Sequence, residues 1–497
     1  MPISFDLSPL WLISWLLIPY LAAFIAALLP SVGPGLLLLS SLATVLVGLF
    51  PLLGESSVPL DLLGRYGVSL NLDLQAGWFV LLNGVLFTAV LLDGWQRRCA
   101  GQSAMLLLVL QGGLNTAFLC TDLISLYVTL EVIGISAFLL ILSGRSDRSL
   151  WIGLRYLLVG NTAMSLYLIG AGLAYSQTGS FTFESLRDLA LGAPQVFLLI
   201  GLLTKAGLFV SGLWLPSTHA QASPEISALL SGVVVTAGAA PLLRIGELNA
   251  SLQLVLQVVG LASALLGLIY ALCIHDAKRL LAWSTLSQMG LVVLSPASGG
   301  LMALAHGFAK ATLFLQARSF ATRDLRHWSQ QRLSGAVWIP LLIASVSIPG
   351  LPPLLGAAAK KSLSEVLPLP WSVLPELLAI GSVAVYARLC SVPVIAACQP
   401  SSAASTPHGS TSPESSAGSW GSWLLVAALL IGGWVAASPG DWLATALVFG
   451  AGLLLHLLLE ALRRRQDLQL PALDSLQALI GNLGLVGAAL LMALRGV

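Results

Sequence analysis

Five ionisable side chains lie within long apolar stretches of the sequence, where a charge is costly. Glu131 lies in TDLISLYVTLEVIGISAFLLI, Lys205 in LLIGLLTKAGLFVSGLWLP, and Lys360 directly follows SVSIPGLPPLLGAAA. His306 and Lys310 share LMALAHGFAKATLFL at a spacing of four, so they lie on one face of a helix. An ionised group at the centre of a bilayer costs about 2.5–3.5 kcal/mol on insertion scales, so such residues face a polar interior and mark functional sites.

Opposite charges at these positions suit proton chemistry. A carboxylate beside an ammonium forms a proton site whose affinity each partner tunes, so Glu131 and a buried lysine predict an ion-translocating, proton-linked subunit. The alternative is an ion pair that only holds two helices together. Lys310 lies too near the middle of its stretch for its ammonium to reach an interface. A lone His456 in another apolar run indicates packing.

The composition identifies lipid as the solvent of these stretches. Of the 497 residues, 57% are hydrophobic and 9% are charged, whereas soluble proteins carry about 25% charged residues. We therefore expect an integral membrane protein, with no basic face for nucleic acid. The five cysteines lack iron–sulfur and zinc spacings, so we expect no cofactor and no metal. The first apolar stretch lacks a charged leader and a cleavage site, so it is expected to remain as a span.

The predicted fold class is all-α, a polytopic membrane protein of about 14–16 transmembrane helices. A transmembrane helix needs roughly 20 apolar residues. Sixteen stretches come near that length: 9–29, 34–53, 76–93, 104–120, 122–143, 151–175, 196–215, 226–244, 252–274, 280–296, 300–317, 334–358, 371–397, 421–437, 442–460 and 474–494. With the N-terminus outside, five of the inside loops carry thirteen of the 23 basic residues, as the positive-inside rule requires.

Glycines and prolines predict that two spans are broken. Gly207 and Gly212 lie in the seventh span, and proline pairs interrupt the twelfth in SVSIPGLPPLL. Broken helices at membrane depth are tolerated where they line a cavity, and they mark the binding sites of transporters. Because the two broken spans are five apart, spans 4–8 and 9–13 would form two inverted repeats.

A polar stretch near the C-terminus divides the chain. Residues 399–419 are rich in Ser, Pro, Gly and Thr, which bury little apolar surface and indicate a disordered linker. The predicted domains are N-terminal helices 1–75, a proton-translocating core 76–398, a linker 399–420 and C-terminal helices 421–497. Asp276, Lys278 and Arg279 are interpreted as a solvated inner loop.

Four motifs in this order resemble a known family. KAGLFVSGLWLPSTHAQASPEISALLSG at 205–232 is similar to K-x-x-x-F-P-x-H-x-W-L-P-x-A-H-x-x-A-P-x-x-x-S-A-L-L-S-G, and HDAKRLLAWSTLSQMG at 275–290 to D-x-K-R-L-L-A-Y-S-T-I-S-Q-M-G. HGFAKATLFL and GLPPLLGAAAK match in spacing. These patterns belong to the antiporter-like membrane subunits of respiratory complex I and of Mrp-type multisubunit sodium/proton antiporters, and the D-type Mrp subunit is the most similar. The resemblance covers roughly residues 70–395.

The resemblance implies a proton pathway across the middle of the membrane. It would run from the pair of Glu131 and Lys205 to Lys310, preceded by His306, and on to Lys360, where other subfamilies carry a glutamate.

Three positions depart from the family pattern. The lysine of span eight is here Thr236, and the proline and histidine that follow the span-seven lysine are Val210 and Gly212. Thr236 can hold a water molecule but no charge. The pathway would therefore contain a gap that only water could bridge.

Three functions fit this sequence. The chain is interpreted as the proton-translocating subunit of an Mrp-type Na⁺/H⁺ antiporter. Alternatively, it is a proton-pumping subunit of a complex I-like NAD(P)H:quinone oxidoreductase, or a non-conducting scaffold of such a complex. A stand-alone secondary transporter would leave the four motifs unexplained. The expected partners are protons, Na⁺ as a candidate ion, other membrane subunits and the bilayer of a prokaryotic inner or thylakoid-type membrane. Any redox chemistry would belong to partner subunits.

Overall fold

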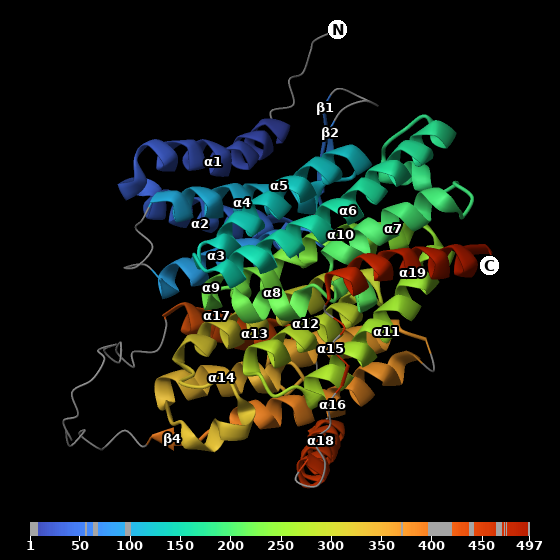
Figure 1. Ribbon diagram of the computed structural model, residues 1–497. Coiled ribbons are helices and arrows are strands. Elements are labelled where there is room, and N and C mark those ends of the chain that lie inside the picture. The colour runs from blue at the N-terminus through green and yellow to red at the C-terminus, as the bar shows by residue number, and fades with distance from the viewer. Residues whose placement is uncertain are drawn as a thin grey trace.

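The computed structural model describes residues 8–54, 57–62, 68–94, 101–368, 371–395, 420–436, 442–463, 470–471, 473 and 475–495. These residues are mostly helical, and the helices lie side by side in one bundle (Figure 1). The helices are α1 (Ser8–Leu28), α2 (Gly33–Gly54), α3 (Leu74–Asp93), α4 (Gly101–Leu119), α5 (Leu123–Leu142), α6 (Asp147–Thr178), α7 (Ala193–Lys205), α8 (Leu215–Gln221), α9 (Pro224–Leu229), α10 (Thr236–Leu248), α11 (Ala250–Cys273), α12 (Ala277–Val292), α13 (Pro296–Gln316), α14 (Gly335–Ser347), α15 (Leu355–Val366), α16 (Leu374–Cys390), α17 (Trp420–Val435), α18 (Trp442–Arg463) and α19 (Leu476–Arg495).

Short elements connect these helices. A hairpin of β1 (Val58–Leu62) and β2 (Val68–Leu72) pairs antiparallel, with Leu60 opposite Leu70. Strands β3 (Leu333–Ser334) and β4 (Val394–Ile395) pair in parallel. The 3₁₀ turn η4 (Phe209–Gly212) separates α7 from α8, and the π-helical segment η5 (Leu230–Val234) separates α9 from α10.

The helix lengths and composition suit a membrane. Nine described helices or helix pairs are long and apolar enough to cross one, and the bent unit of α7 with η4 and α8 would make ten. Shorter apolar helices lie within α4, α14, α17 and α19. Each predicted span falls on a helix or on a broken helix. The all-α polytopic fold and both broken spans are therefore confirmed, while the inverted repeats remain a prediction.

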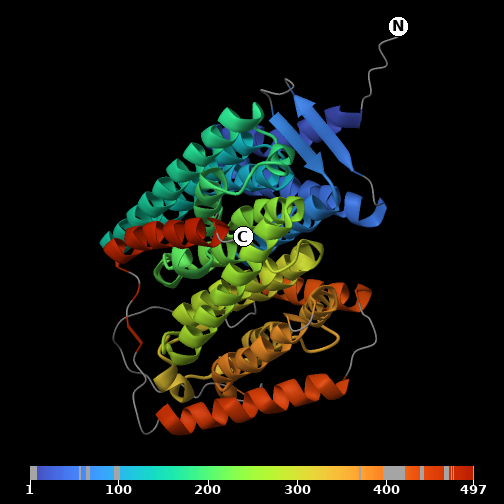
Figure 2. The ribbon, with the colours of Figure 1, turned by 90° about the vertical axis from the view of Figure 1, so that its right-hand side faces the viewer.

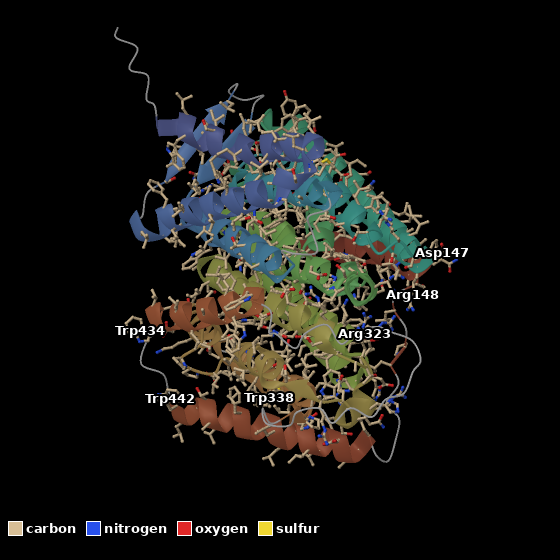
Figure 3. All side chains as sticks on the ribbon, turned by 90° about the vertical axis from the view of Figure 1, so that its left-hand side faces the viewer. Asp147, Arg148, Arg323, Trp338, Trp434 and Trp442 are labelled. Carbon is tan, nitrogen blue, oxygen red and sulfur yellow. The ribbon has the colours of Figure 1, made fainter. Side chains whose placement is uncertain are left out.

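The two ends of the bundle carry different residues. Arg148 and Arg323 lie at one end, and Trp434 and Trp442 at the other (Figure 3). At the first end two loops lie side by side, because the Ala277 N–H donates to the carbonyl of Arg323 at 2.8 Å. We call this end the arginine face and the other end the opposite face. Tryptophan near the opposite face agrees with the aromatic belts of membrane proteins.

Close packing between helices depends on small residues, as is usual in membranes. A Cβ on Gly48 of α2 would lie 2.4 Å from the backbone nitrogen of Leu81 in α3, and a Cβ on Gly84 would lie 2.6 Å from that of Val45. Side-chain hydrogen bonds also join these helices. Asn83 of α3 donates to the side-chain oxygen of Asn115 of α4 at 2.8 Å. Helices α2, α3 and α4 therefore form a fixed N-terminal support for the core.

Two details differ from the sequence interpretation. Lys278 was expected in a solvated loop, but α12 already begins at Ala277, capped by the side chain of Asp276. Lys278 is completely buried and donates a 2.5 Å hydrogen bond to the carbonyl of Ala222. The twelfth span was expected to end at residue 358, but its second half, α15, continues to Val366.

The three C-terminal helices pack in three different places. Helix α17 packs on α3 and α13, α18 on α16, and α19 on α7 and η4. Figure 2 shows α18 along one edge of the molecule and α19 well away from it. The predicted linker 399–420 lies almost wholly outside the described residues, and the division into four domains remains a prediction.

Candidate proton pathway

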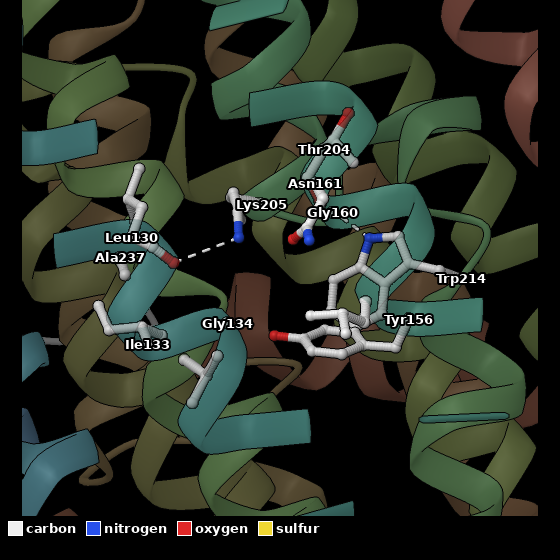
Figure 4. A pocket seen from close by; sticks show the side chains of 12 residues that line it. Leu130, Ile133, Gly134, Tyr156, Gly160, Asn161, Thr204, Lys205, Trp214 and Ala237 are labelled. Carbon is white, nitrogen blue, oxygen red and sulfur yellow. Dashed lines mark hydrogen bonds between the residues drawn. The ribbon is translucent and has the colours of Figure 1, made fainter. Parts of the chain in front are cut away.

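Glu131 and Lys205 come together between α5 and the end of α7. The Lys205 Nζ lies 3.9 Å from Glu131 Oε1 and donates a hydrogen bond of 3.2 Å to the carbonyl of Leu130 (Figure 4). A glycine leaves room for the ammonium, because a Cβ on Gly134 would lie 2.9 Å from the Nζ. The structure therefore brings this predicted pair together, largely shielded from the surroundings.

A small cavity of about 20 Å³ lies beside Lys205. Tyr156, Gly160 and Asn161 of α6 line it together with Trp214 (Figure 4). A buried water needs about 10–15 Å³ of such space. The cavity can therefore hold one water molecule next to the ammonium.

The break in the seventh span places Lys205 at a helix end. Gly207 has a φ of +67°, a conformation that favours glycine, and it ends the helical path. The indole N–H of Trp214 donates to the carbonyl of Thr204 at 2.9 Å, and this carbonyl also accepts from the Gly207 N–H at 3.1 Å. Helix α10 closes against this point, since a Cβ on Gly238 would lie 2.3 Å from the backbone nitrogen of Ala206.

Lys310 lies on α13 and is completely buried. Its Nζ donates to the carbonyl of Leu281 at 2.8 Å, to the hydroxyl of Ser284 at 2.7 Å and to the hydroxyl of Tyr386 at 2.8 Å. The two hydroxyls lie 2.5 Å from each other. All three partners are neutral oxygens, contributed by α12 and α16.

His306 lies one turn before Lys310 and faces a second small cavity. Its Nε2 is 3.3 Å from the carbonyl of Ser231 in η5, and its Nδ1 has no hydrogen-bond partner among the described residues. The cavity of about 10 Å³ is lined by His306, Gln288 and Lys360. It therefore joins the α13 site to the second half of the twelfth span.

Lys360 lies on α15, and its environment is unlike that of Lys310. Its side chain is 8% exposed, and within the described part of the chain its Nζ has no hydrogen-bond partner. A Cβ on Gly350, which has a φ of +101°, would lie 3.3 Å from the Cδ of Lys360. The Nζ of the neighbouring Lys361 lies 4.0 Å from Oε1 of Glu365, and its side chain is 40% exposed, so Lys360 is the more buried of the two lysines.

Thr236 does not contribute to these groups. It is the first residue of α10, two residues after the end of η5, and its hydroxyl donates to the carbonyl of Val233 at 2.7 Å. This hydroxyl is thus used within its own helix turn. No group of three His, Cys, Asp or Glu side chains that could hold a metal occurs among the residues described.

Comparison with protein families shows which family this chain belongs to. Residues 120–383, just over half of the chain, match the family described as "NADH:quinone oxidoreductase/Mrp antiporter, TM". The chain belongs to this family. The matched region contains every residue of the candidate pathway. As a member of this family, the chain is an integral membrane protein.

Individual relatives come from more than one kind of complex. The N-type subunit of NADH-quinone oxidoreductase from Desulforudis audaxviator is 32% identical over 337 residues, covering 59% of this chain and 66% of that protein. The D-type subunit of the Na⁺/H⁺ antiporter from Alkalihalophilus pseudofirmus is 28% identical over 330 residues, covering 60% and 66%. The chain spans just under two thirds of these curated relatives. A chain of the Mrp complex from a Dietzia species has the same fold, with a TM-score of 0.70, 20% identity and coverage of 96% and 99%.

The sequence interpretation missed three buried polar residues of this chain. Tyr386 and Ser284 complete the Lys310 site, and their only signal was a polar side chain in a long span. His219 of α8 is completely buried, and its ring lies 5.7 Å from that of Phe314. It stands in the motif STHAQ, which could have marked it.

Proposed function

We propose that this chain is the proton-translocating membrane subunit of a multisubunit cation/proton antiporter of the Mrp type. Protons would move along Glu131, Lys205, Lys310, His306 and Lys360. The observation that carries this proposal is the Lys310 site. A lysine kept only for structure would be expected to face a carboxylate, because a buried charge needs a compensating one.

The oxygen atoms around Lys310 suit a group that gains and loses a proton. Carbonyl and hydroxyl oxygens accept hydrogen bonds from an ammonium. The hydroxyls of Ser284 and Tyr386 can also turn and donate to a neutral amine. Both protonation states of Lys310 therefore find partners without a large rearrangement.

The pair of Glu131 and Lys205 would act as the first switch of the pathway. A buried ammonium is stabilised by a nearby carboxylate, and separating the two favours release of the proton. At 3.9 Å the pair is close but not in direct hydrogen-bond contact, and the Leu130 carbonyl holds the ammonium on one side. Water in the adjacent cavity could accept the proton.

Beyond Lys310 the pathway would continue through His306 and Lys360, which line the same small cavity. The weak point is Thr236, whose hydroxyl donates to Val233 within its own helix. Conduction from Lys205 to Lys310 would therefore depend on transient water.

A proton-pumping subunit of a complex I-like quinone oxidoreductase is the second candidate function. It is supported by the relative that is named as an NADH-quinone oxidoreductase subunit. Both functions share the same pathway and require other membrane subunits as partners. A scaffold that no longer conducts is the alternative to both.

The test measures pH-gradient dissipation on cation addition in membrane vesicles that contain the native complex, comparing wild type with Lys205→Ala. Loss of exchange, with the complex still assembled, supports a place in the ion path. Arg187→Ala is the matched control, because it removes a basic side chain that is 55% exposed and pairs with the exposed Glu184. Exchange that survives Lys205→Ala would make the chain a scaffold. Proton uptake driven by quinone reduction instead of by a cation would favour the second candidate.

A further inference from the structure

The turn that breaks the seventh span contains a strained residue. Phe209, the first residue of η4, has a φ of +48°, and Gly207 two residues earlier has a φ of +67°. Glycine adopts this left-handed region at no steric cost, but in other residues the Cβ crowds the following carbonyl oxygen. A bulky residue persists in this conformation where the surrounding structure holds it, and such residues gather at functional sites. Contacts from other helices must therefore hold Phe209.

The hydroxyl of Ser263 on α11 supplies such a contact. The Phe209 N–H donates to Ser263 Oγ at 2.9 Å. Ser263 is completely buried, and its hydroxyl in turn donates to the carbonyl of Leu286 on α12 at 2.9 Å. A backbone N–H within a membrane span needs an acceptor from the protein, because lipid offers none. The Ser263 hydroxyl therefore stabilises the one orientation of the turn in which the Phe209 N–H is paired.

The turn around Phe209 follows the helix end that carries Lys205. Helix α7 ends at Lys205, whose Nζ lies 3.9 Å from Glu131 Oε1. The turn is compact, because a Cβ on Gly212 would lie 2.3 Å from the carbonyl carbon of Gly207. A backbone rotation at Phe209 would therefore be passed to the end of α7, and it would change the spacing of Lys205 and Glu131.

Ser263 also connects this turn to the helix that holds the second lysine. Its hydroxyl donates to Leu286 of α12. The same helix binds the ammonium of Lys310 through the Leu281 carbonyl and the Ser284 hydroxyl. The two lysine sites therefore share α12 as a support, and one serine hydroxyl joins α12 to the break beside the first lysine.

We infer that Ser263 is a positioning residue of the proton pathway, because its hydroxyl holds Phe209 in the strained turn and so fixes Lys205 beside Glu131. Ser263 acts through the turn, since its two hydrogen bonds go to Phe209 and Leu286. Without the hydroxyl, Phe209 would relax to a negative φ, and the end of α7 would move. The inference rests on the proposed function, because it states how the first lysine of that pathway is held in place.

The test compares variants of this chain in the native complex. Ser263→Ala removes the acceptor of the Phe209 N–H. Ser287→Ala is the matched control, because it removes a buried hydroxyl that joins the same two helices, donating from α12 to the Ala264 carbonyl on α11 at 2.8 Å. Phe209→Gly relieves the strain, whereas Phe209→Ala removes the same ring but keeps the Cβ that causes the strain. Each Phe209 variant is made with and without Ser263→Ala.

Two readouts separate the turn from transport. Hydrogen–deuterium exchange of a peptide that contains Phe209 reports on the opening of the turn in the purified complex. Cation/proton exchange in vesicles, measured as a function of pH, reports on Lys205. In the part of the chain that the structure describes, Glu131 of α5 and Tyr156 of α6 are the titratable side chains beside this ammonium.

We expect Ser263→Ala to speed deuterium uptake around Phe209 and to lower cation/proton exchange about tenfold, whereas Ser287→Ala should change neither. The alkaline limit of exchange should move to lower pH, because an ammonium further from its carboxylate releases its proton more easily. Adding Phe209→Gly to Ser263→Ala should restore most of the exchange, since the left-handed turn then costs nothing, and adding Phe209→Ala should not.

Unchanged deuterium uptake in Ser263→Ala, or equal exchange in the two double variants, would overturn the inference. If Ser263→Ala does not assemble, the thermal stabilities of Phe209→Gly and Phe209→Ala in the otherwise unchanged chain decide. The glycine variant should be the more stable, and equal stabilities would show that Phe209 is not strained. Failure of the proposed function itself would appear as absent exchange in wild-type vesicles, while deuterium uptake would still report on the turn.

Discussion

At the scale of residues, Lys310 and Lys360 are both buried, but their ammonium groups have very different surroundings. Lys310 has three neutral oxygen partners, whereas the Lys360 Nζ has none among the described residues. A buried polar group without a partner costs about 1–3 kcal/mol, and more when it is charged. In the proposed pathway, Lys310 would hold a proton more stably than Lys360 would.

The hydroxyl of Tyr386 can be tested by removing it alone. Tyr386→Phe takes away one of the three acceptors of Lys310 and also a partner of Ser284. We expect exchange activity to fall about tenfold, which corresponds to about 1.4 kcal/mol, in vesicles with the complex assembled. Tyr127→Phe, whose ring stacks on Tyr167 at 6.5 Å, is the control. Activity equal to wild type would show that the two remaining oxygens are sufficient.

The pair of Glu131 and Lys205 gives a second prediction. Glu131→Gln and Lys205→Ala should reduce exchange to a similar extent, because each removes the same ion pair. The double variant should be no worse than either single variant, since coupled residues are not additive. Exchange measured in the same vesicles checks this. Clearly unequal single losses would count against a working pair.

At the scale of elements, the breaks position the lysines, and close glycine contacts hold the breaks. Helix α7 ends at Lys205 because Gly207 takes a positive φ. Helix α10 can approach this end only because Gly238 lacks a side chain. The position of Lys205 is therefore set by the packing at the break. The hydropathy of the span does not determine it.

Gly238→Ala should disturb this contact. Its Cβ would lie 2.3 Å from the Ala206 nitrogen, so the backbones must move apart. Overpacking of this kind costs about 1–3 kcal/mol. We expect a lower thermal stability in detergent together with reduced exchange. Gly172→Ala on α6, where a Cβ meets nothing within 4 Å, should change neither quantity.

The sequence predicted the helices well, because a span is a local property. Each apolar stretch of about 20 residues became a helix or a broken helix, and proline and glycine located both breaks. The end of the twelfth span was wrong, since Lys361, Ser364 and Glu365 lower the hydropathy while α15 continues. The π-helical segment η5 could not be predicted, because neither the composition nor the spacing of its residues, LSGVV, distinguishes it from an α-helix.

The candidate site was predicted less completely, because its partners are distant in sequence. The charges of Glu131, Lys205 and Lys310 stood out in apolar surroundings. Tyr386 follows Lys310 by 76 residues, and a contact over that distance depends on how α13 packs against α16. Lys278 was misplaced because its charged neighbours suggested a loop, whereas Asp276 caps a helix.

At the scale of the whole molecule, one arginine ties together three distant parts of the chain. Arg318 follows α13, and its guanidinium lies 2.8 Å from Asp93 at the end of α3. It also forms an ion pair with Glu225 in the first turn of α9. The Asp93 side chain is completely buried. This cluster therefore joins the end of α3 to the start of α9 and to the segment after α13.

Removing Arg318 should destabilise the whole bundle. Truncating one partner of a buried ion pair costs about 3–5 kcal/mol, because it leaves a buried charge without compensation. We expect Arg318→Ala to unfold earlier in a thermal or detergent titration. Arg326→Ala breaks an exposed pair with Asp324, which is worth about 0–1 kcal/mol, and serves as the control. Equal stability of the two variants would contradict a stabilising role of the ion pairs that Arg318 forms with Asp93 and Glu225.

The position of α19 also bears on how the protein is made. This helix packs against α7 and η4, and a Cβ on its Gly487 would lie 2.9 Å from the Cδ1 of Ile200. Ribosomes add about 5–20 residues per second, so Leu476 follows Lys205 by on the order of ten seconds to a minute. During synthesis, α7 and η4 beside Lys205 are made well before α19, the helix that packs on them. A half-made chain thus leaves η4 and this side of α7 uncovered until α19 has been made.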